Sequence, residues 1–301
     1  MKITIIGANS YIARNLIYYI KSRYKDVDLR LSDWQERHAD EIENYKRINV
    51  SDHGSLSQAD LKCDVIFIFT GKTGSAAGFD DADTFIDLNE KSLLHILNEY
   101  RKQKSEAKII YPSTRLVYKG AEKLLKEDDE KEFRTIYAMN KYACEWYLKQ
   151  YSRAFAVKYC VLRICVPYGT MIKGASCSGT VEFMLHKARN RKNITIYGNG
   201  QVKRTLTHIE DLCSCMYAAA LSDKCVNDVY NIDGEIYSLA DMAETIADQF
   251  GTGVDYISYP SLEGCIESGS TIFDGTKLNS RIGYVRVHTF TEWCENQCVK
   301  E

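Results

Sequence analysis

A tyrosine and a lysine stand four residues apart in the stretch YAMNK, at Tyr137 and Lys141, just ahead of a helical stretch. Positions i and i+4 of a helix share a face, so both side chains can point into one cleft. A free tyrosine has a pKa near 10 and is a poor base at neutral pH. A lysine cation at roughly 4 Å contributes on the order of 4 kcal/mol at an effective dielectric of about 20. This predicts a phenol with a lowered pKa, as acid–base work requires. Surface helices also carry such pairs by chance, so other motifs in the chain must show whether this pair is catalytic.

A second pattern follows the first apolar run, in the sequence GANSYIA (7–13). Gly7, Ser10 and Ala13 occupy the positions of a G-x-x-G-x-x-G turn, with two glycines replaced by small residues. A dinucleotide turn needs small residues where the chain reverses, where the backbone approaches the pyrophosphate and where helix packs on strand. The N–H groups at the start of the helix then hold the anion. A plain strand–turn–helix connection can show the same pattern.

An acidic residue supports a dinucleotide site. Asp33 ends the second predicted strand, 20 residues after Ala13, where a carboxylate binds the ribose hydroxyls of NAD. The same carboxylate repels the 2′-phosphate of NADP, although Arg37 nearby leaves a minor route to NADP. Asp52 follows the third strand and either faces the adenine or lies in a solvent-exposed loop. The sequence therefore predicts NAD as the cofactor.

Composition excludes several other classes of protein. The chain has 301 residues, 45% of them hydrophobic and 27% charged, with a net charge of -2. No strong attraction to nucleic acid or an anionic membrane is expected, and no apolar run approaches the roughly 20 residues that span a bilayer. The eleven cysteines are scattered without metal-site spacing, so no metal site is predicted. With no secretion signal recognised, we expect reduced thiols and a cytoplasmic location.

The order of the predicted elements gives the fold class. Strands are predicted at 2–6, 28–32, 64–70, 107–113 and 156–164, with helices at 11–23, 85–102 and 137–152. Strands that alternate with helices predict βαβ units and a parallel α/β sheet. After about residue 165 shorter strands and helices follow, which indicates a second, smaller lobe. The charge-rich stretch 119–134 is predicted to be a solvated surface loop.

With these motifs in place, the chain resembles the extended short-chain dehydrogenase/reductase family, and within it the NAD-dependent epimerases and dehydratases of nucleotide sugars. GANSYIA matches the cofactor turn, and STRLVYK (113–119) resembles an S-S-x-x-V-Y-G stretch. YAMNK matches Y-x-x-x-K, and GNGQVKRTLTHIEDL (198–212) resembles a G-x-G-x-x-x-R-x-x-x-H-x-x-D-L segment. The resemblance covers nearly the whole chain. It implies a Rossmann doubly wound parallel sheet over 1–165 that binds NAD, and a smaller C-terminal α/β substrate lobe over 166–301, with some segments returning to the first domain.

The resemblance implies catalytic roles for Thr114, Tyr137 and Lys141. Tyr137 takes the proton of a sugar hydroxyl while NAD accepts the hydride, and Lys141 also holds the nicotinamide ribose. The positive nicotinamide ring helps to lower the phenol pKa. Thr114 takes the place of the catalytic Ser/Thr, counting back from Val117, and strand alternation turns its neighbour Ser113 to the opposite face. A transient keto-sugar that takes the hydride back on its other face is inverted at one carbon, most often C4 in such relatives.

The predicted contacts form two sets. Cofactor contacts are expected at Gly7, Asn9, Ser10, Tyr11, Ile12, Asp33, Val50, Asp52, Thr70, Gly71, Asn89, Tyr137 and Lys141. Substrate contacts are expected at Lys72, Thr114, Arg115, Tyr168 and Arg204.

Some of the substrate contacts leave alternatives open. The guanidinium of Arg204 suits a diphosphate, and a surface arginine on a strand edge is the lesser alternative. Lys72 either contacts a substrate or cofactor phosphate or lies in solvent. Tyr168 matches a loop under the substrate. Val166 stands where the family frequently carries an asparagine near the phosphates, so one polar contact is lost.

The predicted function is a nucleotide-sugar epimerase, with a nucleotide-diphosphate sugar as substrate. Arg115 and Leu116 stand where dehydratases and decarboxylases commonly carry an acidic residue, which disfavours dehydration. A keto-sugar reductase or dehydrogenase shares all these residues and remains the alternative; an NAD-binding sensor or scaffold is a third interpretation. Helices at 85–102 and 137–152 resemble a pair that builds a four-helix dimer interface, so a homodimer is expected. Trp146 and Tyr147 fit such a contact or the core.

Overall fold

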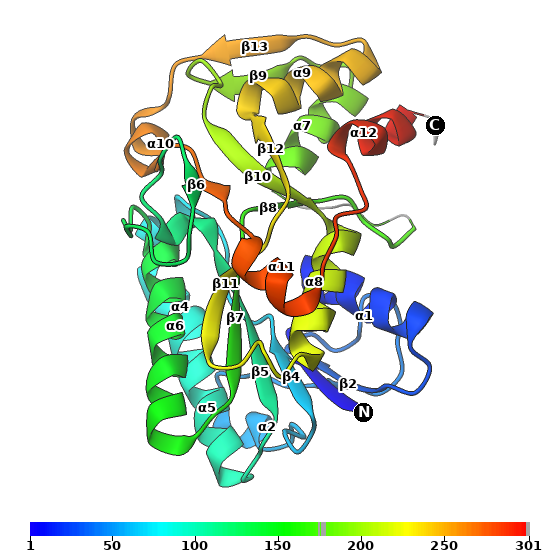
Figure 1. Cartoon of the computed structure of the whole chain (residues 1–301), viewed down its shortest axis with the longest axis vertical. Helices are drawn as coiled ribbons and strands as arrows, with labels where there is room; N and C mark the ends of the chain where they lie inside the picture. The colour runs from blue at the N-terminus through cyan, green and yellow to red at the C-terminus, as the bar shows by residue number, and fades with distance from the viewer. Residues whose placement is uncertain (174, 176–178, 299–301) are drawn as a thin grey trace.

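Within the residues that the structure describes (1–173, 175 and 179–298), seven parallel strands form one large sheet (Figure 1). In this computed structural model they lie in the order β11-β7-β5-β4-β1-β2-β3. Their bounds are β1 (Lys2–Ile6), β2 (Asp28–Asp33), β3 (Tyr45–Arg47), β4 (Val65–Ile68), β5 (Lys108–Thr114), β7 (Tyr159–Ile164) and β11 (Asp228–Asn231). The strand order reverses at β1, which pairs with β2 on one side and β4 on the other. The predicted Rossmann-type, doubly wound α/β sheet is confirmed, and its switch point lies at the carboxyl ends of β1 and β4.

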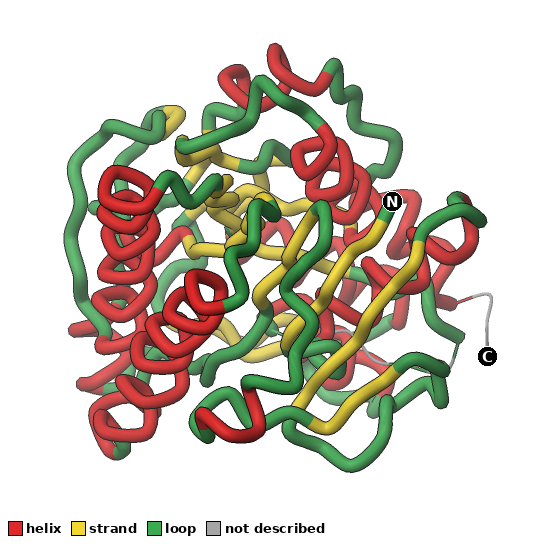
Figure 2. The backbone as a smooth tube through the Cα atoms, turned by 90° about the horizontal axis from the view of Figure 1, so that it is seen from below, coloured by secondary structure: helices red, strands yellow, loops and turns green. Residues whose placement is uncertain are grey.

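Helices cover both faces of the sheet (Figures 1 and 2). On one face lie α1 (Tyr11–Arg23) and α8 (Ile209–Leu221), and on the other α5 (Ser92–Lys102) and α6 (Ile136–Phe155). Leu16 of α1 and Met216 of α8 belong to one buried cluster, whereas Leu97 of α5 and Leu148 of α6 belong to another. Because both faces are covered, β4, β5 and β7 are buried along their whole length, which explains their nearly continuous apolar sequences.

Short helical segments connect these elements. They are α2 (His53–Leu56), α3 (Ala77–Asp80), α4 (Ala82–Ile86), a π-helical turn (Asp87–Lys91) that joins α4 to α5, and a 3₁₀ turn (Arg115–Val117) after β5.

A smaller lobe lies above the carboxyl ends of the large sheet (Figure 1). Its strands are β8 (Val166–Tyr168), β10 (Lys203–His208) and β12 (Glu235–Ser238) in one sheet, and β9 (Ile194–Tyr197) and β13 (Val254–Ile257) in another. Its helices are α7 (Thr180–Arg189), α9 (Leu239–Phe250), α10 (Ser261–Ile266) and α12 (Phe290–Cys298). Residues of α7, α9, β8 and β10 share one buried apolar cluster.

Segments from the second half of the sequence return to the large sheet. After β10 the chain runs through α8, which packs on α1, and then forms β11 beside β7. The helix α11 (Thr276–Ile282) packs on α8 and β11. The chain therefore crosses between the lobes more than once.

The charged stretch 119–134 is more than a solvated loop, contrary to the sequence-based expectation. It contains β6 (Leu124–Leu125), which pairs with β14 (Ile272–Phe273). Leu125 is buried against Tyr118 and Phe273. Its charged side chains lie at the surface for the most part, but its backbone lines a buried polar network described below.

No described helix combines the length and the apolar character needed to cross a bilayer. The nine cysteines whose side chains are described carry free thiols.

Candidate active site

The turn between β1 and α1 is built for a close backbone approach. Gly7 has a φ of +85°, and a Cβ at this position would lie 2.6 Å from the carbonyl carbon of Phe69 and 2.7 Å from the amide nitrogen of Thr70. Only glycine fits both the conformation and the space. Ser10 caps α1, and its Oγ accepts a hydrogen bond from the amide of Ala13 (3.4 Å). The amino end of α1 therefore faces the carboxyl ends of the strands, where it can hold a phosphate.

Asp33 is fixed at the carboxyl end of β2. Its Oδ2 accepts a hydrogen bond from the backbone amide of Asn9 (2.9 Å), and its Oδ1 accepts one from the amide of Trp34 (2.7 Å). Each carboxylate oxygen keeps acceptor capacity for a further donor. Asp33 lines a cavity of about 520 Å³ together with Gly7, Asn9 and Val50.

A second cavity of about 540 Å³ adjoins the first. Both are lined by Ser10, Phe69, Thr70 and Gly71, so together they form one crevice across the switch point of the sheet. The second cavity collects most of the remaining predicted residues: Tyr11, Ile12, Asn89, Thr114, Arg115, Tyr137 and Lys141.

The first turns of α6 carry the Tyr137–Lys141 pair into this cavity. Thr135 caps the helix, and its side chain accepts a hydrogen bond from the amide of Ala138 (3.0 Å). Lys141 donates hydrogen bonds from Nζ to the carbonyl oxygen of Pro112 (2.9 Å) and to the hydroxyl of Tyr111 (3.2 Å). The same Nζ lies 6.0 Å from the centre of the Tyr137 ring. The two side chains thus share one face of the helix and one cavity.

The electrostatics of this pair differ from the sequence-based expectation. Burial is the largest cause that raises the pKa of Tyr137 above its usual value, and the neighbouring Cys144 acts in the same direction. Burial also lowers the pKa of Lys141 to about 8, although Cys144 and Glu145 oppose that shift. The expected lowering of the phenol pKa is wrong for the protein's own groups, because burial disfavours the charged phenolate. The protein by itself holds a neutral phenol.

Thr114 and Ser113 make different contacts at the carboxyl end of β5. Thr114 Oγ1 accepts a hydrogen bond from the amide of Leu116 (3.3 Å), which leaves its hydroxyl proton for a ligand oxygen. The hydroxyl of Ser113 instead donates to Glu145 Oε1 (2.5 Å) in the interior. Thr114 is therefore the hydroxyl available to a substrate.

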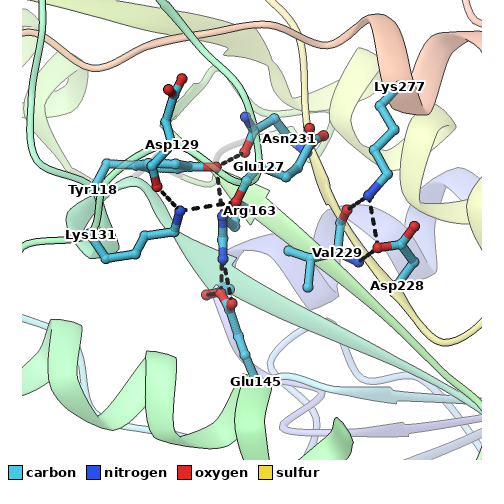
Figure 3. A network of polar contacts seen from close by, with 11 residues as sticks. Tyr118, Glu127, Asp129, Lys131, Glu145, Arg163, Asp228, Val229, Asn231 and Lys277 are labelled. Carbon is cyan, nitrogen blue, oxygen red and sulfur yellow. Dashed lines mark hydrogen bonds and ion pairs between the residues drawn. The ribbon is translucent and has the colours of Figure 1, made fainter.

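A buried polar network supports the strand that carries Thr114 (Figure 3). Arg163 on β7 donates from Nε to Glu145 Oε1 (3.0 Å) and from Nη2 to Glu145 Oε2 (2.6 Å). Its Nη1 donates to the hydroxyl of Tyr118 (2.7 Å) and to the carbonyl oxygen of Glu127 (2.9 Å). Arg163 and Glu145 are 3% and 5% exposed. Because Glu145 lies one turn after Lys141, the network locks α6 against β5 and β7. Sequence analysis missed it, since its members are far apart along the chain.

Asn89 holds the turn after β4. Its Oδ1 accepts from the amide of Lys72 (2.9 Å), and its Nδ2 donates to the carbonyl oxygen of Lys72 (3.1 Å). Gly71 has a φ of +138°, and a Cβ there would lie 2.3 Å from Asn89 Oδ1. Asn89 lines the cavity and at the same time shapes its wall.

Three of the predicted substrate contacts lie elsewhere. Lys72 forms an ion pair with Asp81 on the surface. Tyr168 is fully buried, and its ring packs on Phe290 and Trp293 in the small lobe. Neither of these two side chains lines the crevice.

Arg204 is the third substrate contact that the structure places elsewhere. Its Nη2 donates to both carboxylate oxygens of Glu267 (2.8 Å each), and its Nη1 donates to the carbonyl oxygen of Gly269 (2.8 Å). At 2% exposure it joins strands and loops within the small lobe. The prediction of a direct diphosphate contact is not supported.

Asp52 also serves a local structural role. Its side chain accepts a hydrogen bond from the amide of Gly54 (2.9 Å) and caps α2. The cavity that contains Asp33 is lined instead by the neighbours of Asp52, namely Asn49, Val50 and Ser51.

Several lining residues were not singled out from the sequence. Trp34 and Gln35 follow Asp33 and line the first cavity, and Thr73, Gly74, Cys165, Gly179 and Thr180 line the second. Trp34 stands directly after the acidic residue, so position alone could have indicated it. The others come from loops whose approach depends on the tertiary fold.

One group of side chains could in principle hold a metal ion. Ligand atoms of His208, Glu210 and His288 lie within 4.8 Å of one another, outside the crevice. The two imidazole rings are stacked, with centres 4.1 Å apart and planes inclined by 26°, so their in-plane lone pairs do not converge on one point. Glu210 is also paired with Arg23. This arrangement does not fit a metal centre.

Comparison with known proteins agrees with this geometry. Residues 3–233 match the model of the NAD dependent epimerase/dehydratase family. CDP-paratose 2-epimerase of Salmonella typhi is 26% identical over 227 residues, which cover 66% of this chain and 67% of that protein. A putative UDP-glucose 4-epimerase of Methanocaldococcus jannaschii is 25% identical over 168 residues, covering 55% of this chain and 54% of that protein. The matches thus span about half to two thirds of these relatives.

Solved structures share the fold over the whole chain. UDP-glucuronic acid 4-epimerase from Bacillus cereus, in complex with UDP-glucuronic acid and NAD, superposes with a TM-score of 0.87 at 20% identity, covering 100% of this chain and 99% of that chain. UDP-glucose 4-epimerase from Thermus thermophilus, in complex with NAD, superposes with a TM-score of 0.85 at 17% identity. The superposition covers 98% of this chain and 97% of that chain.

The residues of the crevice fit NAD. The Gly7 turn and the amino end of α1 suit a pyrophosphate, and the carboxylate of Asp33 keeps acceptors for two ribose hydroxyls. The family match extends over most of the chain and covers every residue of this crevice. The chain therefore belongs to the NAD dependent epimerase/dehydratase family and is an enzyme with NAD as its cofactor.

Proposed function

We propose that this enzyme is a nucleotide-sugar epimerase, which inverts one carbon of the sugar, C4 in our assignment, through a transient keto-sugar. One observation carries the proposal. Thr114, Tyr137 and Lys141 line the same cavity, and that cavity shares four lining residues with the one that contains Gly7 and Asp33. A hydroxyl-bearing carbon held at Thr114 therefore lies between the proton-transfer groups and the cofactor crevice.

The chain's own residues handle the proton. Thr114 donates its hydroxyl hydrogen to the reacting sugar oxygen and holds that oxygen near Tyr137. Tyr137 takes the proton of this oxygen as the carbon is oxidised and returns it when the carbon is reduced. NAD, when bound, accepts and returns the hydride and adds a positive charge beside the phenol. For Tyr137 to act as a base, this positive charge must lower the pKa of the phenol by more than burial raises it.

Lys141 supplies position and charge from behind the phenol. Its bonds to Pro112 and Tyr111 fix the ammonium at the end of β5. With a pKa of about 8 it stays a cation at neutral pH, although only by a small margin. Its third donor is left for a ribose hydroxyl or for the phenolic oxygen.

The lining of the second cavity argues against elimination of water. None of the described residues that line it is Asp or Glu. Dehydration requires an acid–base group beside the one that serves the oxidised carbon, and Arg115 and Leu116 stand where a carboxylate would serve. Inversion needs only the Thr114–Tyr137 proton path. The epimerases among the relatives and structural neighbours also support this choice.

Incubation with UDP-, dTDP- and GDP-sugars, without added cofactor, tests the proposal. Product analysis by NMR should show an epimer, and a substrate carrying deuterium on the inverted carbon should yield product that keeps the label. Stoichiometric consumption of added NADH, with no isomerisation, would instead establish the keto-sugar reductase. Absence of both reactions over the whole panel would rule out catalysis on nucleotide sugars.

We also propose a homodimer built on α6 and its neighbours. Met139 and Trp146 on α6 are 53% and 42% exposed, and Ile86 on α4 is 37% exposed. The helices that carry these side chains, α4 and α6, pack on each other, and Figure 1 shows them in the same layer of helices as α5. Tyr147, by contrast, is used within the chain, since its hydroxyl donates to Glu90 Oε2 (2.8 Å). A second copy of this helical layer would cover the exposed side chains.

A further inference from the structure

Arg115 is a positively charged residue that lines the same cavity as the proposed catalytic hydroxyl of Thr114. It follows Thr114, begins the 3₁₀ turn after β5 and lines the second cavity. Its Nη1 makes a long hydrogen bond to Thr271 Oγ1 (3.5 Å). Among the described residues, no carboxylate pairs with this guanidinium, whereas the buried arginines Arg163 and Arg204 each have a glutamate partner.

The surroundings of Arg115 make this cation costly. Burial is the largest cause that lowers its pKa, to about 10, and the positive charge of Arg204 adds to the effect. Cys165 and Glu267 oppose the shift to a smaller extent. Both carboxylate oxygens of Glu267 already accept hydrogen bonds from Nη2 of Arg204. Arg115 is half-buried, and a charge partly withdrawn from water without a paired counterion costs free energy. A ligand anion is the partner that would offset this cost.

The rest of the cavity offers no competing acid, since its described lining contains neither Asp nor Glu. From these contacts we infer that Arg115 binds an anionic group on the sugar itself, and that the substrate is a nucleotide sugar with a carboxylate, of the uronic acid class. Thr114 and Arg115 are neighbours in the chain and line the same cavity, so we place the carboxylate of the sugar in the cavity that also holds the reacting carbon. A planar guanidinium and a carboxylate pair through two parallel hydrogen bonds.

This inference rests on the proposed function, because it names the substrate of the same site. The diphosphate of a nucleotide sugar is a second anion within the ligand, and it is present in every member of the class. A matched pair of substrates separates the two sources: UDP-glucuronic acid and UDP-glucose differ only in carrying a carboxylate or a hydroxymethyl group. Both the dissociation constant and kcat/KM should favour UDP-glucuronic acid in the wild-type enzyme.

The Arg115→Gln variant is the direct test. Its preference for UDP-glucuronic acid over UDP-glucose should fall by roughly 30-fold or more, because a desolvated charge pair is lost. Arg115→Lys should recover part of the preference, since a point charge replaces the planar fork. Lys119→Gln serves as control, because it removes an exposed positive charge four residues along the chain that pairs with Glu130 outside the cavity. Thermal unfolding of each variant shows whether it is folded.

Each outcome decides the matter. Equal losses on both substrates would place Arg115 at the diphosphate and overturn the inference. An unchanged preference, or a wild-type enzyme that binds and epimerises UDP-glucose better than UDP-glucuronic acid, would also overturn it, while the proposed epimerase function would stand. If neither sugar is epimerised but the Arg115-dependent preference persists in the dissociation constants, the proposed function fails and the carboxylate site stands. If neither sugar binds, the inference fails.

Discussion

Lys141 donates a hydrogen bond from Nζ to the carbonyl oxygen of Pro112 at 2.9 Å. This bond joins the first turns of α6 to β5 two residues before Thr114, so the proposed catalytic hydroxyl and the phenol of Tyr137 are set by one connection between helix and strand. One turn further along α6, Glu145 accepts a hydrogen bond from Ser113 of β5 and pairs with Arg163 of β7. The proton-transfer groups are therefore held by a helix and a strand, and not by loops.

Replacing Tyr137 by Phe keeps the ring and removes the proton-transfer oxygen. We expect kcat to fall by about 10²- to 10⁴-fold, while the amount of NAD that copurifies with the protein changes little. Tyr142→Phe is the matched control, since this tyrosine is on the same helix and packs against Phe133 and Trp146 outside the crevice. Steady-state rates and NAD content after denaturation give the answer. A Tyr137→Phe enzyme with normal turnover would remove the phenol from the mechanism.

Lys141→Met should change how stability depends on pH. Burial lowers the pKa of Lys141 from 10.5 to about 8 in the folded protein. Between these values the unfolded chain binds more protons, so the contribution of Lys141 to stability rises with pH through that window. Below pH 8 the buried cation is a full cost, on the order of 3 kcal/mol. The free energy of unfolding of the wild type, relative to that of the variant, should therefore increase from pH 7 to pH 10.5.

Urea denaturation of both proteins across this range measures that difference. Two stability curves that stay parallel from pH 7 to pH 10.5 would mean that Lys141 titrates alike in the folded and unfolded states.

Asp33→Asn should weaken NAD and relax the discrimination against NADP. Hydrogen bonds to a charged acceptor are worth about 1.5–3 kcal/mol, or roughly 10- to 100-fold in Kd. The neutral amide also no longer repels a 2′-phosphate. Asp52→Asn is the control, because Asn caps a helix as well as Asp does and Asp52 lies outside the crevice. Calorimetric titration of both variants with NAD and NADP is the measurement. If Asp52→Asn lost more NAD affinity than Asp33→Asn, the roles that we assign to the two residues would be reversed.

Glu145→Gln should destabilise the fold strongly. Removing one partner leaves Arg163 as a buried charge without its counterion, at a cost of about 3–5 kcal/mol. The exposed pair Lys119–Glu130 offers a comparison, since Glu130→Gln should cost less than about 1 kcal/mol. Chemical denaturation gives both values. Similar small losses for the two variants would show that the buried network contributes little.

Trp146→Glu combined with Met139→Glu should shift the proposed dimer toward monomer. Both side chains are exposed on α6, and a charge placed in an apolar interface is costly to bury. Ile257→Glu is a control of similar exposure on β13 in the small lobe. Sedimentation velocity at several protein concentrations distinguishes the states. A wild-type protein that sediments as a monomer at every concentration would contradict the proposal.

The sequence predicted what depends on neighbouring residues. The Gly7 turn, the carboxylate of Asp33 at a strand end and the shared helical face of Tyr137 and Lys141 are local patterns, and all of these residues line the crevice. The parallel sheet follows from alternating strands and helices, so it too was predicted correctly.

The predictions that failed concern residues whose partners are distant in sequence. Arg204 is engaged by Glu267, and Tyr168 packs on Phe290 and Trp293, all from the last part of the chain. Spacing indicated a cation beside Tyr137, but it contained no information on burial, which sets the direction of the pKa shift. Side-chain type indicates what a residue could bind; only the tertiary fold decides which partner it meets.

The return of β11 to the edge of β7 has a consequence for biosynthesis. The cofactor-holding half cannot be completed by the first 165 residues that leave the ribosome, because its seventh strand arrives only with residues 228–231. Until then β7 presents an unpaired edge to other chains. A truncated gene product that ends before this point would be prone to aggregate, and the two lobes cannot be separated by a single cut into independently folding pieces.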